Sequence, residues 1–102
     1  MPFRRDRFAD VVNRQLDLFE HDRADLIAAA QASLEAYHGA DRDDAPAHYE
    51  RYEDAVEEGQ DALLELRDTY AGRLDEDTAE EYCDVFNRRV RKRLPDFGVE
   101  LE

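Results

Sequence analysis

The sequence has no tryptophan and only one residue each of cysteine, serine and lysine. The lone cysteine, Cys83, has no partner for an internal disulfide and offers no metal-ligand spacing, so we expect a small side chain that is buried or half-buried. The lone serine, Ser33, lies in an alanine-rich stretch, and the chain has neither a Gly-x-Ser-x-Gly nucleophile nor a glycine-rich phosphate loop. We therefore expect no catalytic residue and no cofactor.

Long apolar runs are missing as well. No stretch approaches the roughly 20 apolar residues that a membrane-spanning helix needs. The first residues, 1–7, are basic, but they lead into a polar amphipathic pattern instead of the apolar core of a signal peptide. The sequence therefore predicts no membrane segment and a cytoplasmic location.

Charge of one sign dominates the composition. There are 27 Asp and Glu against 14 Lys and Arg, a formal net charge of −13, and all but one of the basic residues are arginine. This usage is typical of proteins from salt-adapted organisms, because at molar salt the Debye length falls to about 3 Å and repulsion between surface carboxylates is screened. A GC-rich genome would also favour arginine, and a dedicated acidic surface that mimics nucleic acid is a further alternative.

Hydrophobic periodicity predicts an all-α fold in a single domain over residues 1–102. The first helix is expected over residues 6–37, where apolar residues recur every three or four positions and no proline intervenes. The members of this apolar stripe are Phe8, Val12, Leu16, Phe19, Leu26, Ile27, Ala30, Leu34 and Tyr37.

Two further helices are expected over residues 46–70 and 78–94, and Pro95 ends the second of them. A short apolar tail follows, with Phe97, Val99 and Leu101, and it either packs back on the helices or frays.

Gly59 lies on the apolar side of the helix expected over residues 46–70. Antiparallel folding of the first two helices would bring it near Arg23 and Leu26. A glycine at this position is explained if a neighbouring helix or a bulky ring approaches it closely.

These elements predict a three-helix bundle with a long antiparallel helical hairpin and a shorter C-terminal helix. Because the last helix is too short to cover the whole hairpin, an aromatic surface stays uncovered, either around Tyr49 and Tyr52 or around Phe8 and Phe19. Self-association would bury that surface, so we expect a homodimer.

Arg23 interrupts the apolar stripe of the first helix. We expect its guanidinium to reach an acidic neighbour such as Glu57 or Asp61, because an unpaired buried arginine is costly. An alternative assigns Arg23 to a ligand-binding or catalytic site between helices, because small helical enzymes also build sites from arginines and carboxylates.

A basic strip occupies five of the six positions 88–93, in a chain with nine other basic residues. Its members are Arg88, Arg89, Arg91, Lys92 and Arg93. The helix dipole stabilises cations near a helix C-terminus, and acids on neighbouring helices can pair with them, among them Glu20, Asp22, Asp25 and Asp54. As a functional surface, the strip would dock a protein partner. Nucleic-acid binding is a weaker alternative, because the rest of the chain is acidic and no aromatic residue interleaves the strip.

Two histidines, His38 and His48, should meet at one end of the hairpin beside several carboxylates. Such a group could bind Zn²⁺, but a solvated helix turn shows the same residue types, and we predict no metal. The sequence as a whole predicts a small, acidic, non-enzymatic interaction protein that docks a protein partner through an exposed apolar surface and the basic strip. An inter-helix enzyme or ligand site around Arg23, and nucleic-acid binding through residues 88–93, are the alternatives.

Overall fold

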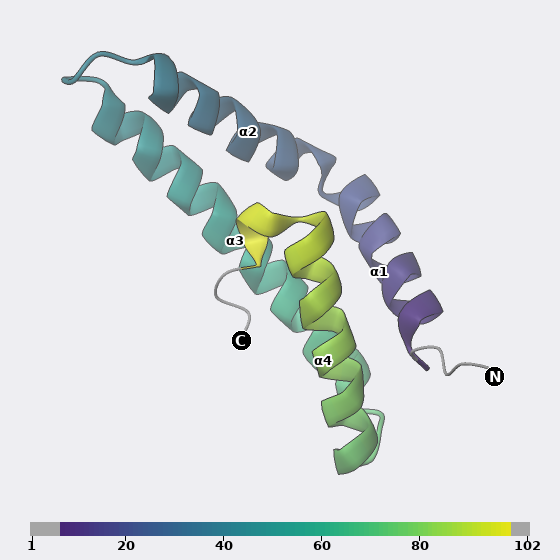
Figure 1. The fold of residues 1–102 in the computed structure, drawn as a ribbon. Helices are drawn as coiled ribbons and strands as arrows, with labels where there is room; N and C mark the ends of the chain where they lie inside the picture. Colours follow the sequence, from purple (N-terminus) through teal and green to yellow (C-terminus); the bar gives the residue numbers. More distant parts are fainter. Residues whose placement is uncertain (1–6, 99–102) are drawn as a thin grey trace.

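The computed structural model describes residues 7–98 of the 102-residue chain. Over this range the chain forms four α-helices and one short 3₁₀-helix, and it contains no strand (Figure 1). The elements are α1 (Ala9–Asp22), α2 (Ala24–Gly39), α3 (Ala45–Ala71), α4 (Glu76–Arg93) and the 3₁₀-helix η1 (Pro95–Phe97). The all-α fold class predicted from the hydrophobic periodicity is confirmed.

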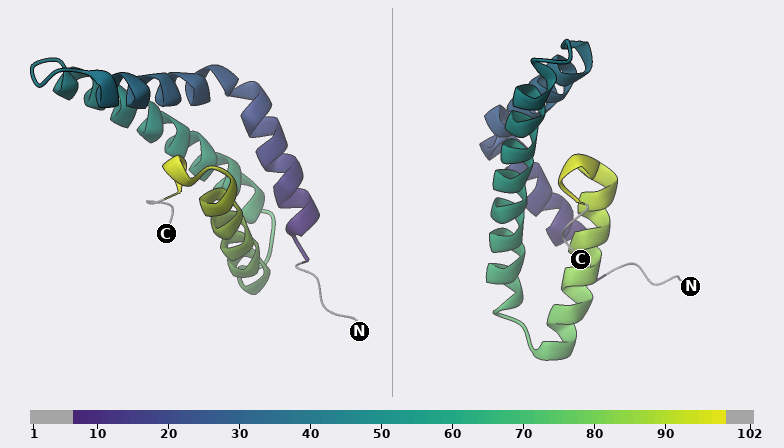
Figure 2. Two further views of the ribbon diagram at one scale, coloured as in Figure 1. Left: turned by 45° about the horizontal axis from the view of Figure 1, so that its top comes forward. Right: turned by 90° about the vertical axis from the view of Figure 1, so that its left-hand side faces the viewer.

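The helix expected over residues 6–37 is divided in two at Arg23, which corrects that prediction. Arg23 has φ −115° and ψ 30°, away from helical values. Its N–H still donates to the carbonyl of Phe19 at 2.8 Å, and its own carbonyl accepts from the N–H of Ile27 at 3.1 Å. Because these hydrogen bonds are kept, the bend needs neither proline nor glycine, and it turns α1 away from the line of α2 (Figure 2).

Asp75 sets the start of α4, two residues before the position expected from the sequence. Its side chain accepts a 2.8 Å hydrogen bond from the backbone N–H of Thr78. This hydrogen bond is the largest of the causes that lower the pKa of the Asp75 carboxyl. Glu76 and Asp77 follow in the first turn, where negative charge is favoured by the helix dipole.

The helices pack around α3, which is long enough to have different neighbours along its length. α2 lies antiparallel to the N-terminal half of α3, α4 packs against the C-terminal half of α3, and α1 packs against α4 (Figures 1 and 2). We call α2 and the facing half of α3 the arm. The molecule measures 55 × 28 × 22 Å and its radius of gyration is 16.1 Å, above the roughly 13 Å of a compact domain of this length. The arm therefore projects from a three-helix core of α1, α3 and α4.

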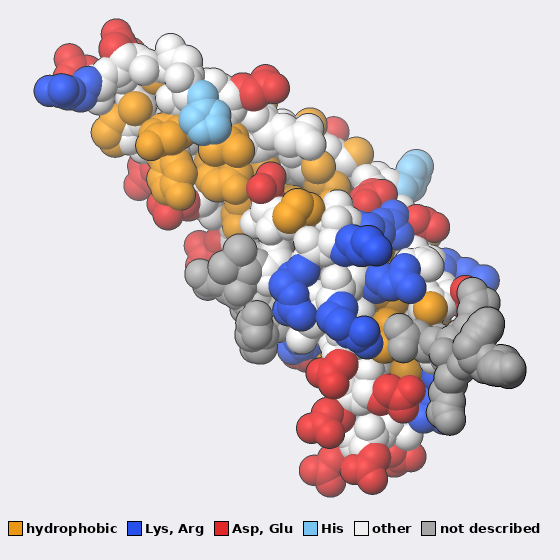
Figure 3. All heavy atoms as spheres, in the orientation of Figure 1, with side chains coloured by type: hydrophobic (Ala, Val, Ile, Leu, Met, Phe, Trp, Pro, Cys, Tyr) orange, Lys and Arg blue, Asp and Glu red, His pale blue; other side chains and the backbone are white. Residues whose placement is uncertain are grey.

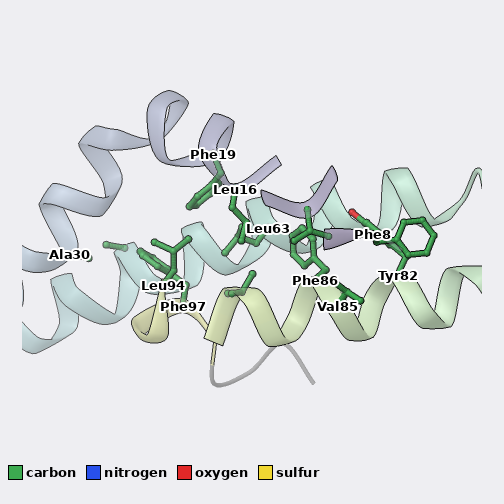
Figure 4. Packing of buried hydrophobic residues seen from close by; sticks show 13 residues of the cluster. Phe8, Leu16, Phe19, Ala30, Leu63, Tyr82, Val85, Phe86, Leu94 and Phe97 are labelled. Atoms are coloured by element: carbon green, nitrogen blue, oxygen red, sulfur yellow. The ribbon is translucent and has the colours of Figure 1, made fainter. Parts of the chain in front are cut away.

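The core contains side chains from every helix, and its centre lies where α1, α3 and α4 meet (Figure 4). Phe19 of α1, Leu63 of α3 and Phe86 of α4 are all buried in this one cluster. The largest fully buried side chains are Val12, Leu16, Leu63, Tyr82, Val85, Phe86 and Val90.

Phe97 packs back on the bundle from η1. Its ring is 2% exposed and meets the Phe19 ring edge to face, with the centroids 6.3 Å apart. A Cβ atom on Gly59 would lie 2.6 Å from Cδ1 of Phe97, so the ring needs a glycine there. The expected close approach at Gly59 is therefore made by this ring. The rest of the expected apolar tail, Val99 and Leu101, lies outside the described residues.

Candidate functional site

Two members of the basic strip turn inward and connect α4 to α1. Arg89 donates to Oδ1 of Asn13 at 3.1 Å. Arg93 donates to the Asn13 carbonyl at 3.2 Å, to Asp17 at 2.8 Å and to Glu20 at 2.9 Å. The hydrogen bond to Asp17 is the main cause that raises the pKa of the Arg93 guanidinium. These two arginines hold helices together.

The other three members of the strip, Arg88, Arg91 and Lys92, are exposed. Arg88 donates through Nε to the carbonyl of Asp84 at 3.4 Å, a long bond within the same helix. Arg88 and Arg91 line a surface hollow of about 420 Å³ together with Asp84 and Asn87. Basic side chains gather over the C-terminal half of α4 and acidic ones over its N-terminal half (Figure 3). The structure thus divides the strip into an inward pair and an outward set of three.

Arg23 lies at the bend between α1 and α2 and pairs with Glu58 of α3. The Arg23 NH1 to Glu58 Oε2 distance is 3.3 Å, and the two side chains are 43% and 62% exposed. Neither expected partner, Glu57 or Asp61, forms an ion pair with Arg23. The pair is a surface contact, and it places the end of α1 beside the middle of α3.

A groove of about 500 Å³ runs between α1 and α3, with Arg23 at one end. We call it the α1–α3 groove. Its apolar residues are Leu18, Phe19, Ala62, Leu66 and Tyr70. None of the four charged residues that line it, Asp22, Arg23, Glu65 and Arg73, is buried.

Three tyrosines lie together on the arm, and we call Tyr37, Tyr49 and Tyr52 the tyrosine patch. The ring centroids of Tyr37 and Tyr49 are 4.9 Å apart, and those of Tyr49 and Tyr52 are 5.7 Å apart. Tyr49 is 39% exposed. Figure 3 shows apolar side chains gathered over the outer part of the arm, where no third helix covers them.

Acidic side chains border this patch. A hollow of about 280 Å³ is lined by Tyr49, Tyr52 and Val56 together with Glu53, Glu57 and Asp96. Burial, followed by the charge of Asp96, raises the pKa of Tyr52. Of the two aromatic surfaces expected to stay uncovered, the one around Tyr49 and Tyr52 is partly exposed, because Tyr49 is exposed and Tyr52 is half-buried. The other is buried, because Phe8 and Phe19 are 7% and 6% exposed.

Sequence reasoning missed two contributors to these surfaces. Tyr37 belongs to the tyrosine patch although it was expected only as part of the apolar stripe. Leu18, which lines the α1–α3 groove, is 56% exposed. The sequence indicated this exposure only in that Leu18 lies outside the apolar stripe of the first helix.

The remaining candidates do not assemble into a metal site. His38 stacks near Tyr37 with ring centroids 5.5 Å apart, and His48 Nδ1 accepts from Arg51 at 3.0 Å. In the part of the chain that the structure describes, no three His, Cys, Asp or Glu residues are grouped so that they could hold a metal ion. Cys83 is half-buried and burial raises the pKa of its thiol.

The helices between residues 7 and 98 include none with the length and apolar character needed to cross a membrane. Comparison with known proteins finds no matching family model, no matching curated protein and no matching solved structure.

Proposed function

We propose that this protein is a small, non-enzymatic interaction protein that docks a protein partner through the tyrosine patch and the outward members of the basic strip. The observation that carries this proposal is the tyrosine patch itself, an aromatic cluster on an arm that only two helices build. Tyrosine and arginine are enriched at protein interfaces, because each offers a large contact area with polar atoms at its end.

The two surfaces are visible on one face of the molecule (Figure 3). The tyrosine patch is bordered by acids, while Arg88, Arg91 and Lys92 supply positive charge on α4. A partner that fits both would place basic residues around an apolar centre at the arm and acidic residues opposite α4. Complementary charge of this kind favours one orientation of the partner over others.

The alternative of an enzyme or ligand site around Arg23 receives less support. Its guanidinium is engaged by Glu58 on the surface. Nucleic-acid binding is also less favoured, because only three members of the strip face outward on a chain of formal charge −13. The salt-adapted origin and the cytoplasmic location that the sequence suggests stay predictions.

The test is affinity capture from the native host at its own salt concentration, with three variants compared with the wild type. Tyr49→Ser alters the tyrosine patch, and a triple variant, Arg88→Ala with Arg91→Ala and Lys92→Ala, alters the strip. Arg14→Ala is the matched control, because it removes an exposed positive charge from α1.

We expect the same partner to be retained by the wild type and by Arg14→Ala and to be lost from both other variants. If every protein captured by the wild type is also captured by the patch and strip variants, the proposal is wrong.

A further inference from the structure

The α1–α3 groove opens on a side of the core that α4 does not line. Its walls are α1 and α3, which run antiparallel, so the C-terminal end of α1 lies beside the middle of α3. The residues of α3 that line it extend from Ala62 to Tyr70, roughly 12 Å at 1.5 Å per residue. Phe19 and Tyr70 contribute apolar surface between these ends.

This face carries a protruding side chain and a hollow next to each other. Leu18 is the most exposed large apolar residue in residues 7–98, at 56%, and it is one of the residues that line the groove. A surface with both a knob and a hole can complement itself, because a two-fold axis places each knob in the other copy's hole.

The charges of the groove also fit a second copy. Two acids, Asp22 and Glu65, and two arginines, Arg23 and Arg73, line it, so its formal charge is zero in a chain of charge −13. The hollow at the tyrosine patch, by contrast, is lined by acids and no base. A second acidic chain would be repelled at the patch but not at the groove.

The charged residues are also arranged along the groove. Asp22 lies at the end of the groove where α1 stops, and Arg73 lies just beyond the end of α3. Because α1 and α3 are antiparallel, these residues occupy opposite ends of the groove. A two-fold axis across the groove would bring Asp22 of each copy to Arg73 of the other.

We propose that a second copy of this chain occupies the α1–α3 groove, with Leu18 of each copy entering the groove of the other and Asp22 facing Arg73 at both ends. This homodimer goes beyond the proposed docking function and is independent of it, because it shares no residue with the tyrosine patch or the basic strip. It would leave both surfaces open on each copy, and a partner with two sites would then bind with avidity.

The first test is sedimentation equilibrium of the full chain in molar KCl over a range of concentrations. We expect a monomer–dimer equilibrium for the wild type. Leu18→Glu should raise the dimer dissociation constant at least about tenfold, because it places a charge in the apolar contact twice. Tyr49→Glu is the control, because it adds the same charge to the tyrosine patch and should leave the dissociation constant unchanged.

The second test exchanges the charges at the ends of the groove. Asp22→Arg and Arg73→Asp should each weaken the dimer, and the two changes combined should restore it, because the pair is rebuilt with reversed signs. Helicity by circular dichroism identifies any variant that has lost its fold.

A wild type that stays monomeric at every concentration would overturn the proposal. So would a dimer that Tyr49→Glu weakens and Leu18→Glu does not, because the arm would then be the interface. Additive weakening by Asp22→Arg and Arg73→Asp would overturn the proposed pairing of the two ends.

Discussion

The contact between Gly59 and Phe97 joins η1 to the middle of α3. Gly59 is buried in a 27-residue helix, where glycine costs about 1 kcal/mol relative to alanine. The Phe97 ring occupies the space that a Cβ atom would take. The loss in helix propensity is therefore offset by the packing of an aromatic ring over α3 and against Phe19.

Gly59→Ala should destabilise the protein by about 1–3 kcal/mol, because the new methyl group displaces the Phe97 ring and overpacking outweighs the gain in helix propensity. Urea unfolding followed by circular dichroism measures the change. Gly39→Ala is the matched control, because a Cβ atom there would meet nothing within 4 Å. Equal stability of Gly59→Ala and the wild type would contradict the packing described here.

Tyr82 is the largest fully buried side chain of the core. Its hydroxyl donates to Oε1 of Gln15 at 2.8 Å, and its ring lies 4.6 Å from that of Tyr70 and 5.4 Å from that of Phe8. Burial, the largest cause, raises the pKa of Tyr82 from 10.0 to about 12. The folded protein therefore holds this proton more tightly than the unfolded chain does.

Tyr82 should make stability depend on pH in the alkaline range. Because the folded pKa is the higher one, its contribution is fully present below pH 10 and is lost as the pH rises toward about 12. Urea midpoints measured across this range should fall less steeply for Tyr82→Phe than for the wild type. Tyr49→Phe removes an exposed hydroxyl as a control, and its profile should follow that of the wild type. Identical slopes for Tyr82→Phe and the wild type would show that Tyr82 does not titrate in this way.

At the scale of helices, periodicity predicted the type of each element better than its limits. The helices around residues 46–70 and 78–94 are present, because their apolar spacing and the terminating Pro95 act locally. The bend at Arg23 could not be predicted, because no proline or glycine marks it. It follows from long-range packing, in which α1 lies against α4 while α2 lies against α3.

The candidate site was predictable to a similar extent. The composition of the basic strip is evident in the sequence, but its division into an inward pair and an outward set of three is not. The inward pair depends on Asn13, Asp17 and Glu20, which are more than 70 residues away in the sequence from the arginines they bind. Aromatic exposure at Tyr49 followed from the short last helix. The groove beside Leu18 required the relative placement of α1 and α3, which no local pattern encodes.

Arg93 should contribute to stability while Lys92, an outward member of the strip, should not. Arg93→Ala removes the hydrogen bonds of Arg93 to Asn13, Asp17 and Glu20. This should lower the free energy of unfolding by roughly 1 kcal/mol, less than the loss of a buried ion pair would, because the two acids are partly exposed. Lys92→Ala, at an exposed position in the same turn, should stay within about 0.5 kcal/mol of the wild type. Thermal unfolding of both variants checks this. Equal losses would mean that the strip acts as one unit.

The elongated shape and the acidic composition act together at the scale of the whole molecule. An arm of two helices buries less apolar surface than the three-helix core does, and in α2 only Ala30 is fully shielded from solvent. The arm also carries Glu53 and Glu57, two of the acids that border the tyrosine patch. Repulsion between carboxylates therefore destabilises the arm, which is the part of the fold that buries the least apolar surface.

Stability should rise from dilute buffer to molar KCl. If every lysine and arginine were matched with an acid, a formal charge of −13 would remain. Salt screens both the repulsion between these excess carboxylates and the attraction in pairs such as Arg23–Glu58, and the reduction in repulsion is the larger of the two effects. Urea midpoints measured at increasing KCl should increase, and amide hydrogen exchange should slow most in α2. Sucrose is the control, because it favours the folded state without screening charge, so it should stabilise the arm and the core without this preference for α2. A urea midpoint independent of KCl would contradict both the salt dependence and the interpretation of the composition as an adaptation to salt.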